Sequence, residues 1–197
     1  MKVLIVYAHP ERKAFPSEVL ESFAAGLEAS GHSIEIIDLY QDGFDPATTR
    51  SEVYGETIPD EIADYQHMVA SADGLAFIAP TWWNGFPAIL RGWIDRVLSY
   101  GFAYTASDNP LGTKGLLQHK KVTVIQFLPE NEAAKKSSGV TQSIKQINSA
   151  NFTDICGIPI MEQHFFDSGK SISEEERTLA LETAFLLGKD FDKDLTW

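Results

Sequence analysis

Eight residues near the middle of the chain combine two adjacent tryptophans with turn-forming residues. Residues 80–87 read Pro-Thr-Trp-Trp-Asn-Gly-Phe-Pro, follow the apolar run at 74–79 and precede a helical pattern that begins at Phe86. A strand that ends in Trp82 and Trp83 and then turns into a helix offers a flat aromatic surface beside backbone N–H groups. Such a surface suits a planar cofactor, although both tryptophans could instead pack in the core or against a second copy of the chain.

A second segment with chemical potential follows the first apolar run of the chain. Residues 8–16 read Ala-His-Pro-Glu-Arg-Lys-Ala-Phe-Pro and lead into a helical pattern. Amide groups and the dipole at a helix N-terminus favour a phosphate, and His9, Arg12 and Lys13 add positive character. The segment therefore indicates an anion site, although a polar surface loop with a structural histidine would show the same pattern.

Several other chemistries lack their sequence signatures. The chain has no glycine-rich dinucleotide or phosphate-loop motif and no Gly-x-Ser-x-Gly elbow of a hydrolase. Its five histidines show no spacing typical of metal ligands. Cys156 is the only cysteine, so no intrachain disulfide can form, and its place just before an apolar strand favours burial over reactivity.

Strands are expected to alternate with helices along the whole chain. Five short apolar runs are typical of strands, and they lie at residues 3–7, 34–39, 75–79, 122–127 and 158–166. The first four are apolar enough for burial on both faces, and the fifth is polar enough for an edge strand. The segments at 41–56 and 105–118 are expected to be long loops.

Helical patterns lie between these runs, and they start near Ser17, Asp60, Phe86, Ser137 and Ser173. Ser17 is expected to cap the first helix, Thr57 and Asp60 give a start signal for the second, and Ser173 with Glu176 forms a capping box for the last. The order predicts an α/β three-layer sandwich with a five-stranded parallel sheet, in a single domain over residues 1–197.

A ligand site is expected beyond the carboxyl ends of the strands, where the strand order reverses. For the order 2-1-3-4-5 this crevice lies between the first and third strands. The loops at 8–16, 80–86 and 128–138 should then line it. The third loop is polar and acidic and has no glycine at residues 129–134 that would let the backbone approach a ligand, so a solvated loop is favoured there.

The charge of the chain limits its partners. Its 197 residues carry a formal net charge of −12 at pH 7, which disfavours nucleic acid and anionic membranes because phosphates bind positive faces. Residues 3–6 are apolar, but neither a signal peptide nor a membrane-spanning run of about 18 apolar residues is expected. A cytoplasmic protein is therefore expected.

Three stretches of this sequence resemble one known family. Residues 80–97 read PTWWNGFPAILRGWIDRV, which is similar to the family pattern P-x-x-W-x-x-x-P-A-x-L-K-G-W-x-D-R-V. Residues 101–104 read GFAY, as the family does, and Ala8-His9 with Phe15 resembles the family's A-H-x-x-x-x-S-F-N opening. The chain thus resembles the flavodoxin-like NAD(P)H:quinone oxidoreductases, over most of its length.

The resemblance implies a flavodoxin-like fold and a bound FMN, or else FAD, that takes hydride from NAD(P)H and passes it to a quinone or similar acceptor in a ping-pong cycle. It also implies a homodimer. The helix at 86–98, which is apolar over a wide face and has Trp93 beside the long loop at 105–118, supports this expectation. Implied cofactor contacts are His9, Phe15, Pro16, Ser17, Pro80, Thr81, Trp82, Trp83, Asn84 and Phe127. Tyr104 matches a substrate-pocket position that faces across the dimer, and no side chain is given an acid or base role.

The chain also departs from the family pattern. Ala14 and Pro16 replace the family's serine and asparagine, and Phe127-Leu128-Pro129-Glu130 replaces its T-T-G-G turn beside the ring. This change motivates an alternative function, a flavin-binding ancillary subunit of a potassium-efflux system with little turnover of its own. A flavodoxin-type one-electron carrier is less favoured, because the T-x-T-G-x-T loop of flavodoxins is missing.

Overall fold

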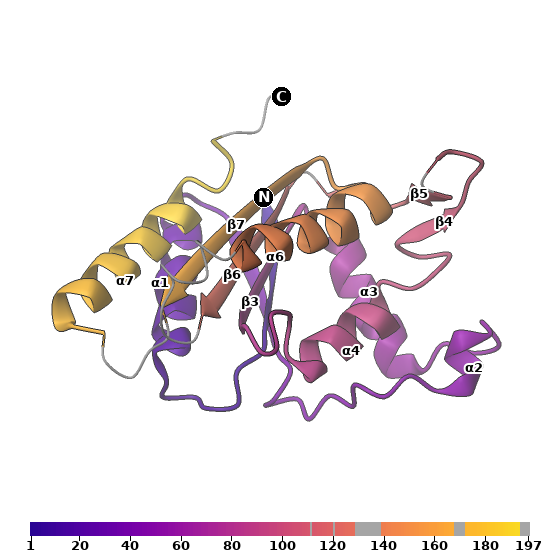
Figure 1. Cartoon of the computed structure of the whole chain (residues 1–197), viewed down its shortest axis with the longest axis horizontal. Coiled ribbons are helices and arrows are strands. Elements are labelled where there is room, and N and C mark those ends of the chain that lie inside the picture. Colours follow the sequence, from indigo (N-terminus) through magenta and orange to yellow (C-terminus); the bar gives the residue numbers. More distant parts are fainter. Residues whose placement is uncertain (111, 120, 129–138, 168–171, 194–197) are drawn as a thin grey trace.

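Five parallel strands form the centre of the computed structural model, which describes residues 1–110, 112–119, 121–128, 139–167 and 172–193 (Figure 1). The strands are β1 (Lys2–Tyr7), β2 (Ser33–Asp38), β3 (Gly74–Pro80), β6 (Lys121–Leu128) and β7 (Ile160–Asp167). They lie in the order β2-β1-β3-β6-β7. This order is equivalent to 2-1-3-4-5, so the predicted α/β sandwich is confirmed.

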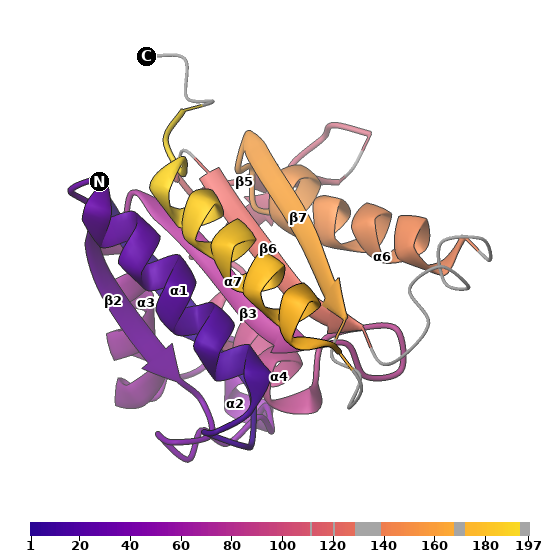
Figure 2. The ribbon, with the colours of Figure 1, turned by 90° about the vertical axis from the view of Figure 1, so that its left-hand side faces the viewer.

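Helices cover both faces of this sheet. Figure 2 shows α1 (Phe15–Ala29) and α7 (Glu174–Lys189) side by side on one face. The other face carries α3 (Asp60–Ser71), α4 (Ala88–Val97) and α6 (Val140–Ser149), which runs on into the π-helix η1 (Ala150–Ile155). The sheet is therefore the middle layer of three.

The side chains of alternate residues in each central strand pack into two different cores, one on each face of the sheet. Val3 and Ile5 of β1 pack toward α1 and α7, whereas Leu4 and Val6 pack toward α3 and α4. Every residue of β3 and β6 is buried. Burial on both faces explains why these strands appear in the sequence as continuous apolar runs rather than as alternating patterns.

Two glycines allow a close backbone contact between the helices of the first face. A Cβ atom on Gly26 of α1 would lie 2.0 Å from the carbonyl oxygen of Phe185, and one on Gly188 of α7 would lie 2.1 Å from that of Phe23. Only glycine allows the two backbones to approach this closely. Both positions therefore help α1 and α7 to cover the sheet as one layer.

The structure corrects the predicted start of the first helix. Ser17 is not its cap, because α1 begins at Phe15 with Ala14 at the N-cap position and Pro16 in its first turn. The Ser17 hydroxyl donates instead to the carbonyls of Ala14 and Arg12, at 2.7 and 2.8 Å. Proline suits a first helical turn because its missing N–H would have no helical partner there.

The other predicted helix starts have mixed outcomes. The Ser173–Glu176 capping box of α7 is confirmed, and α3 begins at Asp60 with Pro59 as its N-cap and no side-chain cap. The fourth helix begins at Ala88 rather than Phe86. Ser137 lies outside the described residues.

The two segments expected to be loops contain short elements. Residues 41–56 include α2 (Arg50–Val53), which Thr49 and Glu52 start with a second capping box. Residues 105–118 include most of a two-stranded hairpin of β4 (Tyr104–Ala106) and β5 (Thr113–Gly115). Elements this short leave too few residues for a periodic pattern to be recognised.

Trp93, which belongs to the wide apolar face that supported the expectation of a dimer, does not lie at the surface of the subunit. Its side chain is fully buried, and its ring packs edge-on against Tyr65 and Phe77 at centroid distances of 6.1 and 6.0 Å. The wide apolar face of α4 is thus used inside one subunit, between α3 and the sheet. Cys156 is buried as expected, and its burial raises the pKa of the thiol to about 11.

Candidate functional site

The carboxyl ends of β1 and β3 bring the two predicted ligand loops together. These strands are neighbours, with Tyr7 opposite Ile78, and the amide of Ala8 extends their ladder by donating to the carbonyl of Ile78 at 3.0 Å. The loop after β1 carries His9 and leads into α1, and the loop after β3 carries the tryptophans. The strand order reverses at this point, where open parallel sheets bind their ligands.

A tight hairpin presents the two tryptophans. The amide of Trp82 donates to the carbonyl of Gly85, the amide of Gly85 donates to that of Trp82, and both distances are 3.0 Å. Between them, Trp83 and Asn84 have φ values of 50° and 59°. Asparagine accepts this left-handed region readily, but a tryptophan there is strained, and such strain is concentrated at functional sites.

Both indole rings of the hairpin reach solvent. The Trp83 side chain is fully exposed, and Trp82 is 44% exposed. Core packing of both tryptophans, the alternative left open by the sequence, is therefore wrong for the single subunit. An aromatic surface of this size on a strained turn is instead available to a ligand or to a partner.

The hairpin also offers free hydrogen-bond donors. The amide of Thr81 donates to the carbonyl of Phe127 at 2.8 Å, and those of Trp82 and Gly85 serve the hairpin itself. The amides of Trp83 and Asn84 make no hydrogen bond within the described part of the chain. Two such N–H groups beside indole rings suit a flat heteroaromatic ring with acceptor atoms along its edge.

The loop after β1 carries three side chains that could contribute positive charge to an anion site, namely His9, Arg12 and Lys13. The Nδ1 atom of His9 lies 3.1 Å from the amide nitrogen of Glu11, so in the tautomer that accepts this N–H the Nε2–H is free to donate. Arg12 and Lys13 are exposed and form no ion pair with the residues that the structure describes. Because Pro16 has no N–H, side chains rather than helix amides must provide most of an anion site here.

Phenylalanines lie under this edge. The Phe127 ring is buried, packs edge-on against Phe15 at 6.1 Å and stacks on Phe166 at 6.0 Å. Phe15 is only half-buried, and Pro16 beside it is buried. The structure thus places Phe127 in the core below the loops and leaves Phe15 at the surface. Pro129, Glu130 and the rest of 129–138 lie outside the described residues.

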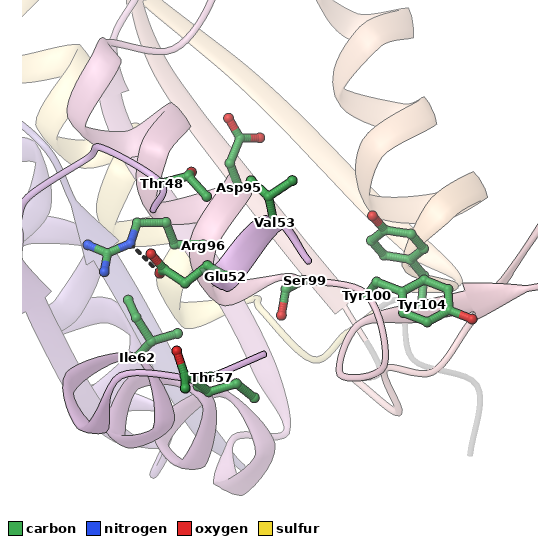
Figure 3. Close-up of a pocket in the computed structure, with 11 residues that line it drawn as sticks. Thr48, Glu52, Val53, Thr57, Ile62, Asp95, Arg96, Ser99, Tyr100 and Tyr104 are labelled. Carbon is green, nitrogen blue, oxygen red and sulfur yellow. Dashed lines mark hydrogen bonds and ion pairs between the residues drawn. The ribbon is translucent and has the colours of Figure 1, made fainter. Parts of the chain in front are cut away.

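Tyr104 lies apart from the other predicted site residues. It follows the far end of α4, whose ten residues extend about 15 Å away from the tryptophan hairpin. There it lines a pocket of about 350 Å³ with Thr48, Glu52, Arg96 and Tyr100, among others (Figure 3). The single subunit therefore does not bring Tyr104 to the crevice between β1 and β3.

A buried ion pair forms one wall of this pocket (Figure 3). The Nε atom of Arg96 donates to Glu52 at 2.7 Å, and both side chains are less than a tenth exposed. Arg96 also donates to the carbonyl of Asp45 at 2.6 Å and lies over the Phe44 ring. It thus fixes the chain between β2 and α2 against α4.

Glu52 has a second role in the same wall. Its other carboxylate oxygen accepts from the amide and the hydroxyl of Thr49, at 2.8 and 2.6 Å. Burial would raise the pKa of Glu52, but the hydrogen bonds from Thr49 and Arg96 outweigh it and hold that pKa below its ordinary value. The Thr49–Glu52 contact was not predicted from the sequence, although its Thr-x-x-Glu spacing is a capping-box signal.

The family model described as a flavodoxin-like fold matches residues 1–185 of the chain. The chain belongs to this flavodoxin-like family. It is 30% identical to an uncharacterised NAD(P)H oxidoreductase of Haemophilus influenzae over 188 residues, which cover 93% of this chain and 92% of that protein. It is 29% identical to the ribosyldihydronicotinamide dehydrogenase [quinone] of Pongo abelii, over 89% of this chain and 85% of that protein.

A solved structure agrees with these relatives. The NAD(P)H:quinone oxidoreductase of Methanothermobacter marburgensis superposes with a TM-score of 0.89 at 28% identity, over 100% of this chain and 99% of that one. The resemblance to the flavodoxin-like oxidoreductases is thus confirmed. Within the described residues, no group of three or more histidine, cysteine or acidic side chains is placed to hold a metal ion. None of the described helices has the length and apolar character needed to cross a membrane.

The buried pair predicts a large effect of Arg96→Met on stability. This change leaves Glu52 buried without its cation, so the free energy of unfolding should fall by about 3–5 kcal/mol. Arg91→Met is the matched control, because Arg91 pairs with Asp95 on the exposed side of the same helix, and it should cost about 0.5 kcal/mol or less. Urea unfolding followed by circular dichroism measures both, and equal losses would contradict the assignment.

Proposed function

We propose that the protein is a flavin-dependent oxidoreductase that is reduced by NAD(P)H and passes the electrons to a quinone or a similar small acceptor. The tryptophan hairpin at the carboxyl end of β3, beside the His9 loop, carries the proposal. Relatives with this fold that are named for NAD(P)H and quinone support the choice of substrates. We propose FMN as the flavin.

The donor chemistry of the site fits such a group. The amides of Trp83 and Asn84, which have no partner among the described residues, would orient the acceptor edge of the ring, and the Trp82 and Trp83 indoles would cover its surface. His9, Arg12 and Lys13 would hold the phosphate in an otherwise acidic chain. Bound flavin supplies the hydride chemistry, in a half-reaction with NAD(P)H and a second with the acceptor. The protein's own part is then to bind, orient and shield.

We also propose that two copies of the chain associate through the pocket that contains Tyr104. Val53, Ile58 and Tyr100 line it, and their side chains are 67%, 57% and 63% exposed. Exposed apolar side chains that gather around a pocket are typical of an interface. A two-fold contact would bury the same patch on both copies.

The wild-type protein provides the first test of the proposed function. Reconstitution with FMN should give a yellow protein whose visible flavin absorbance bleaches when NADPH or NADH is added without oxygen. A quinone added afterwards should restore the absorbance. Protein that takes up no flavin after reconstitution would contradict the proposal, and flavin uptake without bleaching would favour the ancillary role.

Trp83→Ala tests the hairpin directly. Loss of the exposed indole should weaken FMN binding about tenfold, the loss expected for one aromatic stacking partner. Trp83→Phe keeps a ring and should lose less. Tyr54→Ala is the control, since Tyr54 is another exposed aromatic residue and lies beyond α2. Titration of apoprotein with FMN measures all three, and an unchanged affinity of Trp83→Ala would mean that Trp83 serves only packing between subunits.

The proposed dimer is tested by Ile58→Asp. A charge on each copy of the patch should convert a dimer into a monomer at micromolar concentration, while the exposed position leaves the fold of the subunit intact. Leu179→Asp is the control, because Leu179 is as exposed but lies on α7, on the opposite layer. Sedimentation velocity distinguishes the species. A wild-type protein that sediments as a monomer would contradict the dimer.

A further inference from the structure

A buried glutamine interrupts the apolar face of β6. Gln126 is fully buried and lies beside Ala79 of β3, one residue before the edge where the ligand loops begin. An amide at such a position loses its hydration, so it is tolerated only when its donors and acceptors find partners in the protein. The partners of Gln126 therefore show what the residue holds in place.

Three amide side chains form a connected network at this position. The Oε1 atom of Gln126 accepts from the Nδ2 of Asn148 on α6 at 2.9 Å. Asn148 donates its other N–H to the Oε1 of Gln163 on β7 at 3.1 Å. Gln163 in turn donates to the carbonyl of Lys145 at 2.9 Å. The network thus ties α6 and the edge strand β7 to the centre of the sheet.

The direction of these hydrogen bonds fixes the last link of the network. Because Asn148 donates to the Gln126 oxygen, the Gln126 nitrogen faces away from it and donates to the hydroxyl of Thr81 at 3.3 Å. Thr81 is itself buried, and its backbone amide donates to the carbonyl of Phe127 at 2.8 Å. Thr81 is thus held through both its side chain and its backbone.

Thr81 immediately precedes the tryptophan hairpin, whose own two hydrogen bonds lie between Trp82 and Gly85. Those bonds close the hairpin but attach it to nothing else. Thr81 is therefore the point at which the hairpin is joined to the sheet on this side. A fully paired network in a dry interior is rigid, and it loses that rigidity when one member is removed.

We propose that Gln126 is a positioning residue, which, with Asn148, holds Thr81 and so sets the tryptophan hairpin against the flavin of the proposed function. It touches no substrate itself. A leucine at position 126 would fill the same space. The Thr81 hydroxyl would then lose the hydrogen bond from Gln126, and one N–H of Asn148 would lose its acceptor. This inference rests on the proposed function for its ligand, whereas the placement of the hairpin is a property of the protein alone.

The first measurement is hydrogen exchange of the protein without flavin. Gln126→Leu and Thr81→Val should speed exchange of the amides of Thr81, Trp82 and Gly85, because each removes the link between Gln126 and the hairpin. Thr81→Ser keeps the hydroxyl and should exchange as the wild type does. Gln163→Leu is the matched control, since it breaks the same network at the end remote from the hairpin and should lower stability without changing these amides.

The second measurement is FMN binding by the same variants. Gln126→Leu and Thr81→Val should bind FMN about tenfold more weakly, as expected for the loss of one buried hydrogen bond, and should shift the visible absorption of the bound flavin. Gln163→Leu should keep the wild-type affinity and spectrum. If Gln126→Leu does not fold, hydrogen exchange of Thr81→Val against Thr81→Ser, measured without flavin, decides the question.

The outcomes separate the two proposals. Wild-type protein that binds no FMN contradicts the proposed function, and hydrogen exchange still decides whether Gln126 holds the hairpin. Wild-type binding that is unchanged in Gln126→Leu and Thr81→Val overturns the positioning role while the proposed function stands. If Gln126→Leu and Gln163→Leu speed exchange of the hairpin amides equally, the positioning role of Gln126 is also overturned, because the network would then contribute only to general stability.

Discussion

The pairing of β1 with β3 is the constraint on which the candidate site depends. These two strands are adjacent in the sheet, although α1, β2, α2 and α3 lie between them in the chain. Parallel strands require a crossover on one face or the other, and here the crossovers leave on opposite faces at this pair. The loops after β1 and β3 thus start side by side and are covered by no helix of their own. Without this pairing, His9 and the tryptophan hairpin would belong to different surfaces.

Burial on both faces makes that pairing specific. Each residue of β1 from Val3 to Tyr7 is buried, so a slip of one residue would exchange the side chains that fill the two cores. The two layers then hold the sheet in different ways. The face of α1 and α7 relies on the close approach of Gly26 and Gly188, whereas the opposite face combines large aromatic rings with the buried amides of Gln126 and Asn148.

The sequence predicted the parts of this structure that depend on local periodicity. The alternation of strands and helices, the long pattern of α4 and the capping box at Ser173 all follow from spacing along the chain. The features that were not predicted are those on which the spacing of residues along the chain carries no information. A wide apolar face on α4 is compatible with a dimer contact or with the core of one subunit, and Trp93 on that face lies in the core. Gln126 is visible in the sequence only as one polar residue in an apolar run, and its partners Asn148 and Gln163 come from other elements.

The site residues likewise include features that the sequence predicts and features that it does not. Proximity of the His9 loop and the hairpin was predictable from topology, but the backbone of the hairpin was not, because nothing in a Trp-Trp-Asn-Gly sequence requires Trp83 to take the left-handed region. That conformation costs about 1–3 kcal/mol and persists only where the surroundings determine it. Here two hairpin hydrogen bonds close the turn, and Thr81 attaches it to β6 through a backbone and a side-chain contact. A surface arranged in this way before a ligand arrives loses less conformational entropy on binding. The buried amides and the strained, exposed indole are therefore two parts of one arrangement, in which rigidity below the sheet edge keeps an aromatic surface in place above it.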